Sequence, residues 1–193
     1  MNRTIALVVG GSEKVFEEYQ AALDLCAGRP TVNFVLNAMI EDFPGSIDYA
    51  VTLHPESLWS WLKLRREKGL PEPGQFWAHR PAPHITNHTR DWQGSCSLFA
   101  AKIARHIDYE KILLCGCPMT VEDKHFKRHT RWNAAHAFRR GWIARRHELP
   151  PRTVRSMSGW TRETFGFPDV EWLDADLAVS KFRPHIIQPP LPR

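Results

Sequence analysis

The chain has 193 residues, of which 42% are hydrophobic and 24% are charged, so it can form one compact domain with a buried core. No apolar run reaches the roughly 18 residues that a membrane-spanning helix needs, and the stretch Ile5 to Val9 is too short for a secretory signal. Four cysteines, at spacings that fit neither a CxxC pair nor a disulfide framework, predict a cytoplasmic protein.

Charge is unevenly distributed along the chain. Lys and Arg number 26 against 21 Asp and Glu, a net charge of +5. Residues 119–165, called the basic block below, hold 11 Lys or Arg and only 4 acidic side chains. The basic block predicts either an anion site, for nucleic acid or for the phosphates of a small ligand, or a solvated basic helix face.

Short apolar runs alternate with helix-forming segments. In chain order, we expect a strand at 4–9, a helix at 12–27 capped by Ser12, strands at 32–36 and 48–53, and a helix at 55–68. Loops follow at 69–94, with short strands around 76–78 and Ile85. The remaining elements are a helix at 95–106, a strand at 111–115, a helix at 130–147, a strand at 153–156 and a helical turn at 160–165.

This alternation predicts an α/β fold, a Rossmann-like three-layer sandwich with a mostly parallel sheet. We expect one domain over 1–183 and an extended proline-rich tail over 184–193. Ligands of such sheets bind beyond the carboxyl ends of the strands. The residues to inspect are therefore those that follow the expected strands: Gly10 to Ser12, Asn37, His54, Gly116 to Met119, and Ser156 to Gly159.

Two glycine-serine turns precede expected helices. Gly10-Gly11-Ser12 follows the first strand, and Gly94-Ser95-Cys96-Ser97 opens the helix at 95–106. Such turns let backbone amides approach a phosphate, and the helix dipole favours the anion. Neither turn is a GxGxxG or Walker loop, so an ordinary tight turn and a simple N-cap at Ser95 are the alternatives.

Three histidines of the basic block lie close together: His125, His129 and His136. Their spacing is compatible with zinc, but no glutamate of the HExxH kind lies between them and Lys and Arg do, so we predict no metal site. A general base or a phosphate contact is the functional interpretation of this group. Partly exposed structural histidines are the alternative.

Eight tryptophans are present, which is compatible with bases stacking in a nucleic-acid groove. Trp59, Trp132 and Trp142 also recur at positions that suit helical core faces, and core packing is the favoured interpretation. Nucleic acid therefore stays a candidate partner beside a free nucleotide.

The segment Gly94 to Met119, GSCSLFAAKIARHIDYEKILLCGCPM, is the most distinctive in the chain. It resembles a Rossmann-like superfamily pattern: a glycine-serine turn, a helix of small and apolar residues, a tyrosine before a strand, then Gly-x-x-Met. That superfamily includes small bacterial sialyltransferases, motility accessory factors and archaeal hydroxymethylpterin diphosphokinases.

Other segments extend this resemblance over roughly 1–120 and 150–166. VVGGSEKV is similar to the first strand and turn of these proteins, and Asn37 falls where the sialyltransferases have an asparagine. VRSMSGWTRETFG resembles a region of uncharacterised phage and prophage proteins. The resemblance implies a glycosyltransferase-like protein with a nucleotide or nucleotide sugar bound at Gly10, Gly11, Ser12, Asn37, Gly94, Ser95 and Ser97.

Two departures from the superfamily pattern shape the candidate roles. Gly116-Cys117-Pro118 lacks the aspartate that related enzymes have, and 154–157 lacks the histidine of the sialyltransferases. The catalytic candidates are therefore His125 and His129, and the phosphate-binding candidates are Lys124, Lys127, Arg128 and Arg131. The alternative function is a non-catalytic accessory protein that binds nucleotide or nucleic acid through the basic block.

Overall fold

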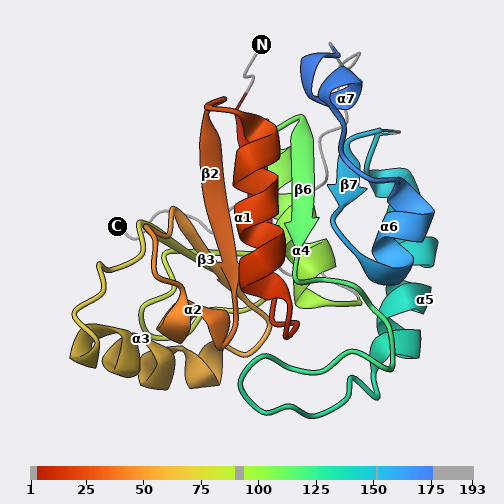
Figure 1. The fold of residues 1–193 in the computed structure, drawn as a ribbon. Helices are drawn as coiled ribbons and strands as arrows, with labels where there is room; N and C mark the ends of the chain where they lie inside the picture. The colour runs from red at the N-terminus through yellow and green to blue at the C-terminus, as the bar shows by residue number, and fades with distance from the viewer. Residues whose placement is uncertain (1–3, 90–93, 151, 176–193) are drawn as a thin grey trace.

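The structure, a computed structural model, describes residues 4–89, 94–150 and 152–175, so the expected tail at 184–193 lies outside the described residues. The described strands form one sheet in the order β5-β4-β3-β2-β1-β6-β7, and every neighbouring pair is parallel. The strands are β1 (Ile5–Val9), β2 (Thr31–Leu36), β3 (Tyr49–Thr52), β4 (Gln75–Ala78), β5 (Asn87–His88), β6 (Lys111–Cys115) and β7 (Val154–Ser156). The predicted α/β class and parallel sheet are confirmed (Figure 1).

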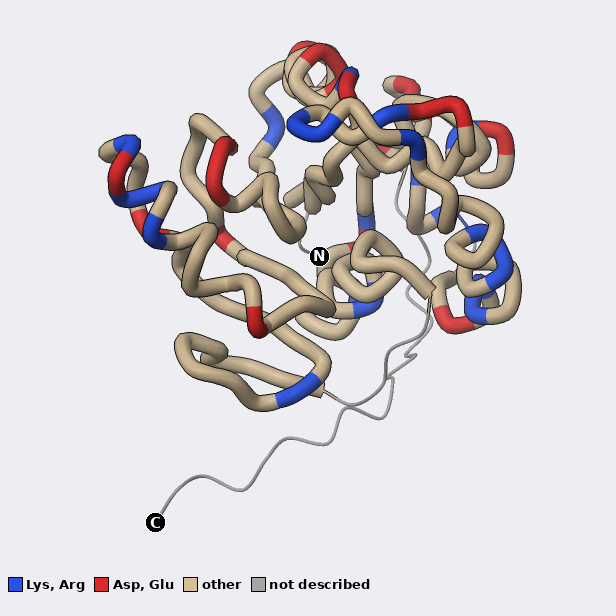
Figure 2. Tube along the Cα trace, turned by 90° about the horizontal axis from the view of Figure 1, so that it is seen from below, with Lys and Arg blue, Asp and Glu red and all other residues tan. Residues whose placement is uncertain are grey.

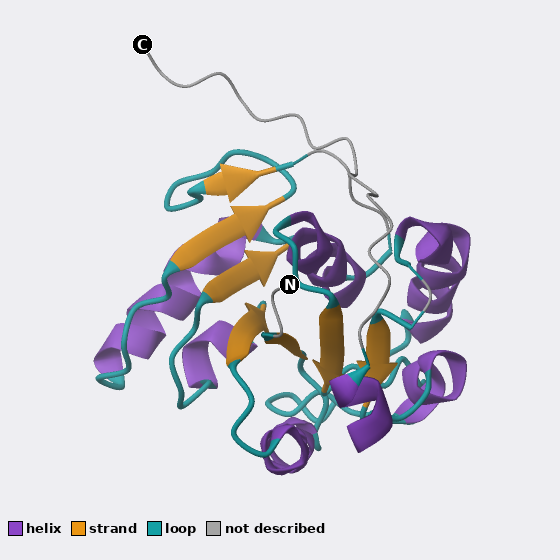
Figure 3. Cartoon of the chain, turned by 90° about the horizontal axis from the view of Figure 1, so that it is seen from above, coloured by secondary structure: helices purple, strands orange, loops and turns teal. Residues whose placement is uncertain are grey.

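Helices cover both faces of this sheet, as Figure 3 shows from the amino-end side. Alternate side chains of a strand point to opposite faces, so Ala6 and Val8 pack in one core cluster and Ile5 and Leu7 in another. The first face carries α4 (Cys96–His106), α5 (Ala135–Arg145) and α6 (Gly159–Phe165). The second carries α1 (Val15–Cys26), α2 (Met39–Asp42), α3 (Leu58–Glu67) and α7 (Val170–Asp174).

The sheet changes its winding direction beside β1. Strands β1 to β5 are added outward on one side, and β6 then pairs with the free side of β1 after the chain has passed through α4. This arrangement makes the carboxyl ends of β1 and β6 the topological switch point, where open α/β sheets bind their ligands.

The largest difference from the expected elements lies before α5. The predicted helix at 130–147 begins only at Ala135, because residues 124–131 form a hairpin in which Lys124 pairs with Arg131. This hairpin is attached to the turn after β1 by pairing of Ser12 with His125, and in Figure 1 it belongs to the long loop below α1. Part of the basic block is thereby carried to the carboxyl-end edge of the sheet.

Smaller differences concern caps, short elements and one tryptophan. Ser12 does not cap α1, whose N-cap residue is Lys14. The Ser12 hydroxyl accepts the Lys14 N–H and donates to Asp123.

The short helices α2 and α7 were not predicted, because four or five residues show no helical period. The strand expected around Ile85 lies at β5, and the chain also forms one-turn 3-10 helices η1 (Pro55–Ser57) and η2 (Arg146–Glu148). Trp59 is 53% exposed, in contrast to its expected core position, whereas Trp142 is buried.

A buried ion pair joins α4 to η2. Lys102 Nζ lies 2.7 Å from Glu148 Oε2, and the two side chains are only 6% and 9% exposed. Arg145 Nη1 lies 2.7 Å from the other carboxylate oxygen. Burial acts to raise the pKa of Glu148, but the hydrogen bonds from Lys102 and Arg145 outweigh it, so the pKa lies below its ordinary value.

We expect Lys102→Met to lower the free energy of unfolding by about 3 kcal/mol near neutral pH, because it leaves a buried carboxylate with one partner. The stabilisation from Glu148 is complete above its unfolded pKa of about 4.3 and is lost as pH falls through the lower folded pKa. Denaturant titrations near pH 7 and near pH 3 should therefore show the wild type approaching the variant in acid. Lys63→Met, which removes an exposed pair with Glu67 at 3.9 Å, is the control and should change stability by less than about 0.5 kcal/mol. An equal loss at both pH values would contradict the expectation.

Candidate functional site

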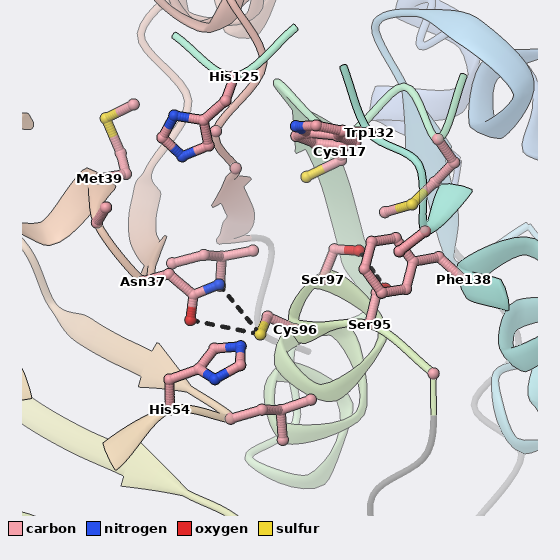
Figure 4. A pocket seen from close by; sticks show the side chains of 18 of the residues that line it. Asn37, Met39, His54, Ser95, Cys96, Ser97, Cys117, His125, Trp132 and Phe138 are labelled. Carbon is pink, nitrogen blue, oxygen red and sulfur yellow. Dashed lines mark hydrogen bonds between the residues drawn. The ribbon is translucent and has the colours of Figure 1, made fainter. Parts of the chain in front are cut away.

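A cavity of about 530 Å³ opens at the carboxyl ends of β1, β2, β3 and β6, at the switch point of the sheet (Figure 4). The N-terminus of α4 forms one side, and the hairpin with the residues up to α5 forms another. Of the residues that sequence reasoning singled out, the cavity brings together Gly10, Gly11, Asn37, Gly94, Ser95, Ser97, His125 and Arg131. It does not bring in Ser12, Lys124, Lys127, Arg128 or His129.

Lys127 has acidic partners within the protein. Its ammonium group forms ion pairs with Glu41 and Asp42 of α2, and Lys68 shares both carboxylates. Through these ion pairs, Lys127 attaches the hairpin to α2. Arg131 is the one Lys or Arg among the described residues that line the cavity.

Backbone donors line the floor of the cavity. The amide N–H groups of Gly11, Cys96 and Ser97 have no acceptor among the described residues. Two of them belong to the first turn of α4, where the helix dipole adds partial positive charge. With Arg131 nearby, and with no Asp or Glu on the described lining, this floor suits an anion such as a phosphate.

The two serines of the second glycine-serine turn differ in their hydrogen-bonding capacity. Ser95 Oγ accepts the Leu98 N–H at 3.3 Å, as the N-cap of α4, and the indole N–H of Trp142 at 3.1 Å. Because both lone pairs are then used, its hydroxyl hydrogen goes to Ser97 Oγ at 2.8 Å. Ser95 is therefore structural, and Ser97 keeps a hydrogen to donate towards Cys117 and the cavity.

Asn37 projects into the cavity from a left-handed backbone position, φ 51°, directly after β2. Its Oδ1 accepts a hydrogen bond from Thr52 Oγ1 at 2.8 Å. Its Nδ2 donates to Cys96 Sγ at 3.2 Å and the Cys96 thiol lies 3.4 Å from Oδ1, and Figure 4 draws these two contacts with Cys96. Burial raises the pKa of the Cys96 thiol, which keeps it protonated at neutral pH. One Nδ2 hydrogen of Asn37 remains for a ligand.

The neighbours of His125 determine which ring nitrogen carries its proton. The Lys127 N–H donates to Nδ1 at 3.2 Å, so the neutral ring carries its hydrogen on Nε2, the atom nearest to Gly11. Burial, and then the charges of Arg128 and Lys127, lower the pKa of His125 and favour this neutral form. His125 thus presents an N–H donor at the cavity and lacks the free lone pair of a base.

His54 is a further functional candidate. The sequence marked it for inspection, because it follows the third expected strand, but assigned it no role. It lines the cavity, and its Nδ1 lies 3.6 Å from Glu56 Oε1. The pKa of Glu56 is lowered first by its own backbone N–H, and also by His54 and Arg80. The Glu56 carboxylate lies on the Nδ1 side of the His54 ring, so Nε2 is the ring nitrogen that remains for a ligand. In Figure 4 the side chain of Asn37 lies between the His125 and His54 rings.

The remaining wall is apolar and aromatic. Trp132 and Phe138, from the segment before α5 and from α5 itself, lie across from Asn37, and Met39 and Met119 add two flexible thioethers. Aromatic faces of this kind bind a planar base by stacking. Met119 was marked for inspection after the strand at 111–115, and Trp132 was assigned to a helical core face, whereas no sequence pattern indicated Met39 or Phe138 as cavity residues.

The described residues include no group of three or more His, Cys, Asp or Glu side chains that could hold a metal ion, and none of the described helices is long and apolar enough to cross a membrane. No protein-family model matches the sequence, and a search of curated proteins finds no match. The fold, however, is similar to a solved structure.

That structure is the sialyltransferase CstII from Campylobacter jejuni, in complex with the substrate analogue CMP-3FNeuAc. The TM-score is 0.51 over 96% of this chain and 94% of the neighbour, at 10% sequence identity. The two proteins share a fold. At this identity the likeness extends to the architecture alone.

Proposed function

We propose that the protein is a glycosyltransferase that binds a nucleotide sugar in the carboxyl-end cavity. The observation that carries the proposal is the combination, in one cavity, of aromatic faces, directed amide donors and an anion-binding floor. A nucleotide sugar presents the matching groups: a planar base, hydroxyls and phosphate. The shared fold with a sialyltransferase solved with a CMP-sugar analogue supports this choice.

The residues divide into roles in this proposal. Trp132 and Phe138 receive the base, and the amides at the start of α4 with Arg131 hold the phosphate. An acceptor oxygen attacks the anomeric carbon while the bond from that carbon to the phosphate oxygen breaks. His54 Nε2 takes the proton of the acceptor hydroxyl, and the His125 N–H stabilises the charge on the departing phosphate.

The proposal is tested by incubating the protein with CMP-, UDP- and GDP-sugars, measuring both the melting temperature and the release of nucleotide. We expect one donor class to raise the melting temperature and to release its nucleotide when an acceptor is present. Stabilisation by oligonucleotides alone, with a steep salt dependence, would support the nucleic-acid alternative instead. Seen from the carboxyl-end side, Lys and Arg positions are interspersed with Asp and Glu positions, which does not favour that alternative (Figure 2).

Arg131→Ala should weaken nucleotide binding about tenfold, because it removes the charged donor from the anion floor. Arg128→Ala is the matched control, since Arg128 is exposed on the same hairpin and does not line the cavity. Isothermal titration with the nucleotide that stabilises the wild type measures both. Equal losses in the two variants would mean a diffuse basic surface and no localised phosphate site.

A further inference from the structure

A second cavity, of about 410 Å³, lies near the C-terminal end of α5. Phe138 near the start of α5 lines the first cavity, and Arg146 directly after α5 lines the second. Because Arg146 follows Phe138 by eight residues and a helix rises about 1.5 Å per residue, the helix separates the two by about 12 Å. The two cavities are therefore distinct sites.

The second cavity is strongly cationic. Arg146, His147, Arg152 and Arg155 line it, from η2, the loop before β7, and β7 itself. None of the three arginines has a carboxylate within ion-pair distance in the described part of the chain. The nearest acid of the same segment, Glu148, is already paired with Lys102 and Arg145. The positive charge of the cavity is thus not neutralised by an ion pair within the described residues.

Arg155 is held by hydrogen bonds and an aromatic contact, and some of its N–H groups remain available to a ligand. Its Nη1 donates to the carbonyl oxygens of Val154 at 3.0 Å and Phe165 at 2.7 Å, and the guanidinium lies over the Trp172 ring at 5.6 Å. Its Nε and Nη2 have no acceptor among the described residues. Burial, and then the charge of Arg152, lower the pKa of Arg155, while the charge of Asp169 acts in the opposite direction.

Cations after a helix complement its negative end, which is a structural explanation for Arg146 and His147. That explanation does not extend to Arg152 and Arg155, because they lie seven and ten residues beyond the end of α5. Cations from η2 and from the start of β7 line one hollow, and this arrangement suits an anion.

We propose that the second cavity binds the phosphate group of a small phosphorylated molecule. Planar guanidinium groups match the oxygens of a phosphate, and Thr164 adds a hydroxyl donor. Leu149, Pro150 and Phe165 provide apolar walls for the rest of the ligand. A hollow of this size encloses a small molecule, whereas a nucleic-acid strand requires an extended groove.

The test is isothermal titration of pyrophosphate at low ionic strength into full-length protein that carries Arg131→Ala, which removes the only Lys or Arg on the described lining of the first cavity and so weakens anion binding there. We expect pyrophosphate to bind this protein, and the further changes Arg152→Ala or Arg146→Ala each to weaken binding at least fivefold. Arg140→Ala is the control, because Arg140 is exposed on α5 and lines neither cavity. Melting temperatures close to that of the parent show that each variant is folded.

Three outcomes would overturn the proposal. The first is that pyrophosphate does not bind the Arg131→Ala protein. The second is that Arg140→Ala weakens binding as much as Arg152→Ala. The third is that a single-stranded oligonucleotide binds far more tightly than pyrophosphate and loses affinity with Arg152→Ala, which would assign the cavity to a nucleic-acid surface.

Discussion

Replacing His54 with glutamine is expected to lower kcat for glycosyl transfer at least 100-fold, while KM for the donor changes little. Glutamine keeps the size of the side chain but has no nitrogen that can accept a proton, so it removes general-base catalysis, which contributes about 10²- to 10⁴-fold. In the proposed complex other residues of the cavity hold the donor, so its binding should persist. Steady-state kinetics with the nucleotide sugar that stabilises the wild type measure both constants.

His125→Gln is the matched comparison, because glutamine retains an N–H donor where His125 is assigned one. We expect its kcat to fall less than tenfold, and that of His125→Ala to fall further. If kcat falls as much in His125→Gln as in His54→Gln, then His125 is the general base and His54 has the other role. Unchanged kcat in His54→Gln would remove His54 from the chemistry.

Gly94→Ala is expected to lower the free energy of unfolding by about 4 kcal/mol. The backbone of Gly94 has φ 89°, which costs a residue with a side chain on the order of 1–3 kcal/mol. A Cβ there would also lie 3.1 Å from Leu98 Cδ2 and 3.2 Å from Gly141 Cα, so α4 and α5 must separate. Because both helices border the cavity, nucleotide binding should weaken as well.

Two further glycines distinguish these causes. Gly69→Ala carries a similar strain, φ 69°, with no atom within 4 Å of the new Cβ, and should cost about 1–2 kcal/mol. Gly141→Ala has no positive φ, but its Cβ would lie 2.4 Å from Gly94 Cα, so it tests the close approach of the helices alone. Denaturant titration of all three variants gives the comparison. Equal costs for Gly94→Ala and Gly69→Ala would show that helix packing contributes nothing.

The core strands were predictable because their signal is local. Ile5–Val9 and Lys111–Cys115 are continuous apolar runs, which a strand buried on both faces requires, and both lie centrally in the sheet. The turn before α4 was predictable for the same reason, since Ser95 caps the helix that follows it, whereas Ser12 does not cap α1 as expected. The parallel topology then follows from the order of strands and helices, and it places the ends of β1, β2, β3 and β6 together.

The basic block shows what sequence spacing could not determine. Lys127 and Arg131 are four residues apart in a segment predicted to be partly helical, yet one pairs with Glu41 and Asp42 and the other lines the cavity. Arg146, Arg152 and Arg155 gather around a second hollow. The sequence by itself determined the main strands and helices, their order and the edge of the sheet at which the first cavity opens, because hydrophobic period and turn chemistry act over short distances. Only the tertiary structure decided which charges are neutralised and which face a cavity, because ion pairing depends on side chains brought together from distant parts of the chain.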